Sequence, residues 1–138
     1  MLAGLTARLE MRVEENDLSA ELRGEGFGVL STPRLVQLLE ATSMEAVREH
    51  LAPNERFLGT GVNIRHLAST PLGMKVTAYA LLKEVRENRL LFFVDAYDEM
   101  ERVAEGELEG ILVSEDQILE RVRSKRGKGG AETRPGER

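Results

Sequence analysis

Glu40 and His66 are the two side chains of this 138-residue chain whose types and expected positions best suit acid–base chemistry. Apolar residues around Glu40 recur with helical spacing, and a helical projection places Glu40 on the apolar side beside Val47. In the segment around His66, period-two alternation places it on the same strand face as Val62 and Ile64, which should meet the helix. Burial of a polar group without a partner costs several kcal/mol of folding free energy, so Glu40 and His66 should not both be buried here without a reason. Two titratable groups that share a desolvated site are often groups whose pKa values are shifted toward catalytic use.

The helix that must carry Glu40 begins at a strong start signal. Ser31, Thr32 and Pro33 give a hydroxyl cap followed by a proline in the first turn. Thr32 lies about 12 Å from Glu40 along the predicted axis, at the positive end of the helix dipole, where a developing oxyanion is stabilised. A role as helix cap alone is the alternative for Thr32. The projected apolar face contains Leu35, Val36, Leu39, Met44, Ala46, Val47 and Leu51.

The rest of the chain predicts strands. "TARLEMRV" alternates weakly and indicates a first strand before the helix. Four more segments follow the helix: "FLGTGVNIRHLAS", "MKVTAYALLKEV", "RLLFFVDAYD" and "RVAEGELEGILV", with turns at "TPLG", Glu87-Asn88 and "EMER". One long helix beside a meander of antiparallel strands is an α+β design, and the sheet of five or six strands must curl around the helix to cover it. We expect one domain over residues 1–120.

Composition narrows the classes of function. Hydrophobic residues make up 41% of the chain, yet no apolar run is long enough to span a bilayer, and the first residues do not resemble a signal peptide. The absence of cysteine excludes disulfides, thiolate nucleophiles and cysteine-bound zinc, and two histidines argue against a histidine-rich metal centre. We expect a cytoplasmic protein with no metal and no membrane partner.

The charge is unevenly distributed. The whole chain carries a net charge of −5, but residues 121–138 contain seven Lys or Arg and two Asp or Glu. This basic segment has few apolar residues and many glycines, and it predicts a disordered C-terminal tail. The remaining residues are acidic, which argues against binding of nucleic acid by the folded domain.

Two stretches, "VLSTPRLVQLLE" and "FLGTGVNIRHLASTPLGMKV", resemble the signatures of the fluoroacetyl-CoA-thioesterase-like branch of hotdog-fold proteins. The resemblance extends over residues 29–113, and the order of strand, long helix and antiparallel strands is that of a hotdog fold. It implies a homodimer with acyl-CoA sites at the subunit interface. Because a single curled sheet leaves an uncovered edge and apolar face, we expect a stable dimer or a dimer of dimers. The resemblance also implies a catalytic set of Thr32, Glu40 and His66, with Gly59 near the acyl group. No cofactor is implied beyond the coenzyme A of the substrate.

The sequence departs from this family at two places. Members carry Gly-x-His-x-Arg on the last strand, whereas "GELEG" places Leu108 and Gly110 at the histidine and arginine positions. The fluoroacetyl-specific enzyme has aromatic residues just before the helix, where this chain has "RGEG". We therefore expect a thioesterase acting on another acyl-CoA or similar thioester. The alternative is a non-catalytic hotdog dimer that binds acyl-CoA or a related ligand.

The expected mechanism has two forms that the sequence leaves open. Glu40 and His66 could activate water, or Glu40 could attack the thioester to form a transient anhydride. In either form, Thr32 and the backbone of Gly59 would stabilise the oxyanion.

Overall fold

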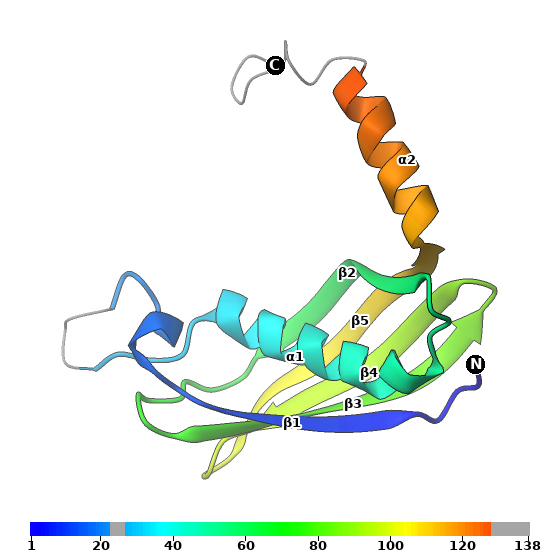
Figure 1. The fold of residues 1–138 in the computed structure, drawn as a ribbon. Coiled ribbons are helices and arrows are strands. Elements are labelled where there is room, and N and C mark those ends of the chain that lie inside the picture. The colour runs from blue at the N-terminus through cyan, green and yellow to red at the C-terminus, as the bar shows by residue number, and fades with distance from the viewer. Residues whose placement is uncertain (23–26, 128–138) are drawn as a thin grey trace.

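A single antiparallel sheet curls around one long helix (Figure 1). The computed structural model of the protein describes residues 1–22 and 27–127. The strands lie in the order β1 (Thr6–Arg12), β3 (Lys75–Arg86), β4 (Arg89–Tyr97), β5 (Arg102–Ser114) and β2 (Glu55–His66). The helices are α1 (Thr32–Val47), α2 (Glu115–Lys125) and the short 3-10 helices η1 (Glu15–Asp17) and η2 (Arg48–His50). The predicted α+β arrangement is confirmed, with five strands. Among the described residues, no helix is both long and apolar enough to cross a membrane.

The buried face of α1 packs mainly on β1 and β3. It consists of Leu35, Leu38, Leu39, Thr42, Ser43, Ala46 and Val47. Met44, predicted on this face, is 42% exposed. The buried face contains the preceding residue, and one step along the helix turns the Met44 side chain away from that face. Thr42 and Ser43 are tolerated there because their hydroxyls donate to the carbonyls of Leu38 and Leu39. Glu40 lies at the border of the buried face and is half-buried.

An irregularity in β2 decides which of its side chains face the helix. Gly59 pairs with Gly110 of β5, but Gly61 pairs with Glu109, so Thr60 is an extra residue in the strand. Simple alternation would place Gly59 and Val62 on opposite faces of the sheet. The bulge at Thr60 brings both to the face that carries α1. Val62 nevertheless stays 48% exposed, because α1 packs mainly on the far strands and leaves this part of β2 partly open.

The C-terminal helix α2 corrects one expectation. Residues 121–125, predicted to begin a disordered tail, form the end of this helix. Ser114 starts α2 with a capping box shared with Gln117, and acidic residues in the first turn and basic residues in the last turn match the helix dipole. Residues 128–138 of the predicted tail, and the "RGEG" segment at 23–26, lie outside the described residues.

Candidate active site

The start of α1 is fixed by side chains other than Thr32. Ser31 is the N-cap, and its hydroxyl accepts a hydrogen bond from the Arg34 amide at 3.2 Å. The Arg34 side chain forms an ion pair with Asp17 at 2.9 Å, and the Ser31 amide donates to the Asp17 carbonyl. Thr32 is therefore the first helical residue rather than the cap, and its hydroxyl is available for another partner.

That partner is His66 at the end of β2. Thr32 Oγ1 and His66 Nδ1 lie 2.8 Å apart, a hydrogen bond that fixes the orientation of the imidazole. Nε2 is then the ring nitrogen left for chemistry, and it is buried without a hydrogen-bond partner among the described residues. Burial lowers the pKa of His66 from its ordinary value, and a hydrogen bond with the backbone of Ala68 acts in the opposite direction. A neutral, oriented imidazole is suited to accept a proton.

Glu40 lies against Gly59 instead of His66. A Cβ added to Gly59 would overlap Glu40 Oε2, so the carboxylate occupies the place of the missing side chain. Within residues 1–22 and 27–127 this carboxylate has no hydrogen bond and no ion pair. A half-buried carboxylate at a bare glycine backbone is free to act as a base or a nucleophile.

The four expected site residues thus form two separate pairs within one chain. Eight residues of helix separate Thr32 from Glu40 by about 12 Å along the axis. Seven residues of β2 separate Gly59 from His66 by about 20 Å. Glu40 and His66 were expected to share one desolvated site. In the single chain each has a different neighbour, because the length of helix and the length of strand given above separate the two pairs.

The positions that depart from the family pattern lie beside the Glu40–Gly59 pair. Gly110 is the direct cross-strand partner of Gly59, and Leu108 is that of Val62. Leu108 is buried, and a side chain at Gly110 would meet the Phe57 ring. The neighbourhood of Gly59 on β5 is therefore apolar and tightly packed, with no room for a histidine or arginine at these two positions.

A long helix wrapped by a curled antiparallel sheet is the hotdog fold. The protein is a thioesterase-like hydrolase with this fold. The sequence profile of the fluoroacetyl-CoA-specific thioesterase family matches residues 13–116, and the chain belongs to this family. The family expected from the two sequence signatures is thereby confirmed.

Individual relatives agree with this assignment. The chain is 33% identical, over 97 residues and 70% of each protein, to a fluoroacetyl-CoA thioesterase of Streptantibioticus cattleyicolor. It is similar to a variant of a fluoroacetyl-CoA thioesterase solved in complex with acetyl-CoA, with a TM-score of 0.82, 27% identity and coverage of 91% and 98% of the two chains. A thioesterase superfamily member from Thermus thermophilus gives a TM-score of 0.85 at 25% identity, covering 95% and 97%.

Proposed function

We propose that the protein hydrolyses an acyl-CoA thioester whose acyl group is not fluoroacetyl. The observation that carries the proposal is the Glu40 carboxylate, which lies against the bare backbone of Gly59 without a hydrogen bond or ion pair among the described residues. The solved relative that binds acetyl-CoA supports the substrate class. Around Gly59, this chain has Leu108 and Gly110 at the positions where the family pattern has a histidine and an arginine. This apolar environment supports an acyl group other than fluoroacetyl.

In the proposed reaction, Glu40 supplies the negative charge that the chemistry needs. It either removes a proton from a water molecule that attacks the thioester carbonyl carbon, or attacks that carbon itself. In both forms the C–S bond breaks and coenzyme A leaves as a thiolate, which takes up a proton. In the second form, water then hydrolyses the anhydride between the acyl group and Glu40, which releases the acid and restores the carboxylate. Thr32 and the Gly59 backbone stabilise the oxyanion, and His66 carries a proton. The proposed chemistry uses protein side chains and water, and coenzyme A enters as part of the substrate. A single turnover in H2-18O tests for the anhydride, because the label enters Glu40 only when water attacks the glutamyl carbonyl of that intermediate.

We further propose that each active site combines two copies of the chain. All four groups must lie within a few ångströms of one thioester, yet the single chain separates them into two pairs. β2 is at the end of the sheet, so its outer edge can pair with another strand. Antiparallel pairing of β2 with itself, about a two-fold axis at Asn63 and with Thr60 as the extra residue, places Gly59 opposite His66 of the second copy. Glu40 and Gly59 would then act with Thr32 and His66 of the partner.

The proposed activity is tested by thiol release from a panel of acyl-CoA thioesters. The panel contains acetyl-CoA, fluoroacetyl-CoA and acyl-CoAs with longer apolar chains. We expect release of free coenzyme A, with a kcat/KM for fluoroacetyl-CoA no higher than that for acetyl-CoA. Preference for fluoroacetyl-CoA would contradict the proposed specificity. Binding of every acyl-CoA without thiol release would instead favour the non-catalytic dimer.

The pH dependence of His66 tests the combined site. Burial disfavours the imidazolium and lowers the His66 pKa, whereas a carboxylate within a few ångströms favours the imidazolium and raises it. We expect His66 to titrate below 6.5 in a Glu40→Gln variant and at higher pH in the wild type. The measurement is an NMR titration of the imidazole proton in a His50→Asn background, where the remaining histidine signal belongs to His66. Equal pKa values in the two proteins would show that Glu40 does not approach His66.

A further inference from the structure

Thr70 is a fully buried polar residue that has no part in the proposed reaction. It lies in the sequence "STP" at residues 69–71, which repeats the three residues that start α1 at 31–33. A buried hydroxyl requires a hydrogen-bond partner. The Thr70 hydroxyl donates to Oδ2 of Asp98 at 3.0 Å. This hydrogen bond joins the loop that follows β2, residues 67–74, to the turn between β4 and β5.

The turn that carries Asp98 is itself held by hydrogen bonds. Oδ1 of Asp98 accepts from the amides of Met100 and Glu101, at 2.8 Å and 2.9 Å. The Asp98 amide in turn donates to the Glu101 carbonyl at 2.9 Å. One oxygen of the carboxylate therefore orders the turn, and the other oxygen receives the Thr70 hydroxyl.

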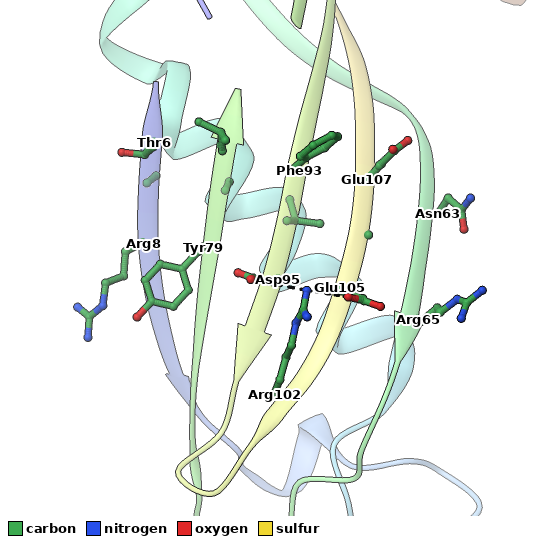
Figure 2. Close-up of a pocket in the computed structure, with 15 residues that line it drawn as sticks. Thr6, Arg8, Asn63, Arg65, Tyr79, Phe93, Asp95, Arg102, Glu105 and Glu107 are labelled. Carbon is green, nitrogen blue, oxygen red and sulfur yellow. Dashed lines mark ion pairs between the residues drawn. The ribbon is translucent and has the colours of Figure 1, made fainter. Parts of the chain in front are cut away.

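The strands on either side of this turn have a fixed position relative to each other. Every residue of β4 pairs with β5 in the sheet. Beside the turn, Arg102 Nη2 lies 2.7 Å from Glu105 Oε2 and 3.9 Å from Asp95 Oδ2, so one guanidinium links β5 to β4 (Figure 2). The turn between β4 and β5 is therefore a well-defined support for Thr70.

The backbone of Thr70 holds the segment that leads into α1. The Thr70 carbonyl accepts a hydrogen bond from the Leu30 amide at 2.8 Å. Val29 and Pro71 form an antiparallel bridge beside it. Thr32 follows this contact by two residues, so the position of Thr70 decides where the first turn of α1 lies.

His66 is held by the same hairpin at the other end of the loop. The Leu67 amide donates to the Val103 carbonyl of β5 at 2.7 Å, which extends the pairing of β2 with β5 one residue past His66. Residues 67–70 therefore have β5 at one end and the β4–β5 turn at the other. The two partners of the Thr32–His66 hydrogen bond are held by the two ends of this short segment.

We propose that Thr70 is a positioning residue for the candidate site, whose hydrogen bond to Asp98 sets the distance and angle between Thr32 and His66. Thr70 acts through Leu30, and a hydrogen bond weakens steeply when its length or angle departs from the preferred geometry. A small displacement of Leu30 therefore reaches the imidazole. The orientation of His66 is a matter of geometry within one chain, and only the expected effect on turnover rests on the proposed thioester hydrolysis.

Thr70→Val tests the proposal, because valine keeps the size of threonine and removes the hydroxyl donor. The readout that needs no substrate is the 15N NMR signal of His66 Nδ1 in the His50→Asn background. Thr32→Val supplies the signal of an imidazole without the Thr32 hydrogen bond. We expect Thr70→Val to move the wild-type signal toward that reference by about half of the difference or more. Thr70→Ser keeps a hydroxyl and should leave the signal unchanged.

Turnover of the best acyl-CoA substrate is the second readout. In Thr70→Val, kcat should fall by about ten- to a hundredfold, because a misplacement of about 1 Å costs up to about a hundredfold in rate. KM should change by less than about twofold, since no group that binds the substrate is removed. Thr70→Ser should recover the wild-type kcat.

Two further variants show whether the effect travels through the Thr70–Asp98 bond. Asp98→Ala should shift the His66 signal in the same direction as Thr70→Val, and the double variant should shift it no further than one of them. Thr42→Val is the matched control. Thr42 is also fully buried, and its hydroxyl donates to the Leu38 carbonyl at 2.7 Å within α1. Its loss should leave the His66 signal unchanged.

The outcomes separate a positioning role from a structural one. A lowered melting temperature in Thr70→Val with an unchanged His66 signal and unchanged kcat would overturn the proposal. A shift of similar size in Thr42→Val would overturn it too, because the signal would then follow stability. If Thr70→Val does not fold, Asp98→Ala breaks the same bond from the turn and decides in its place. A wild type without thiol release contradicts the proposed hydrolysis, while the NMR comparison still decides the role of Thr70.

Discussion

Replacing Glu40 with glutamine is expected to lower turnover of the best acyl-CoA substrate by about two to four orders of magnitude. Glutamine keeps the size of the side chain that lies against Gly59, but it supplies neither a base nor a nucleophile. The melting temperature should hold or rise, because Glu40 has no hydrogen bond or ion pair among the described residues that the substitution could break. Both quantities are measured on one preparation, kcat by thiol release and the melting temperature by calorimetry.

Glu45→Gln is the matched control on the same helix. Glu45 pairs with Arg48 at 2.9 Å on the exposed side of α1, so its loss should leave kcat unchanged. A lowered melting temperature with unchanged turnover in Glu40→Gln would assign Glu40 a structural role and favour the binding dimer over the hydrolase.

The fold could be predicted from sequence because its local signals agree. Ser31 and Pro33 mark the start of α1, and the turn at Glu87-Asn88 separates β3 from β4. The alternation of apolar residues along β3 matches its buried face. The end of the chain was less predictable. Its basic and glycine-rich composition indicated disorder from residue 121, but the Ser114–Gln117 capping box, which the composition does not reveal, starts a helix that continues to Lys125.

The site residues stay a prediction, and the pairing that the structure gives them was not predicted from the sequence. The family resemblance implied Thr32, Glu40 and His66, and spacing placed Glu40 and His66 in one apolar layer. Neither predicted the hydrogen bond between Thr32 and His66, which depends on Ser31 being the N-cap. The bulge at Thr60 was also missed, because one extra residue in a strand of small side chains leaves no periodic signal. The glycines at 59 and 61 on either side of it were the available hint.

The proposed division of the site between two copies predicts recovery of activity when two inactive variants assemble. Glu40→Gln and His66→Asn should each be inactive alone. In a purified mixed dimer, Glu40 of one chain meets His66 of the other at one site, while the second site contains both substitutions. We expect about half of the wild-type kcat per dimer. The mixed dimer is isolated by expressing the variants with two different affinity tags, and thiol release is then measured.

A reciprocal control makes the result decisive. A chain with both substitutions, paired with a wild-type chain, should be inactive if the site is shared, because every site then lacks either Glu40 or His66. If Glu40 and His66 instead act within one chain, the wild-type chain keeps a complete site and this control retains about half of the activity, while the mixture of single variants stays inactive. The two preparations contain the same four side chains per dimer and differ only in which chain carries them. Their opposite responses therefore report the geometry of the site, independently of stability or of the substrate used.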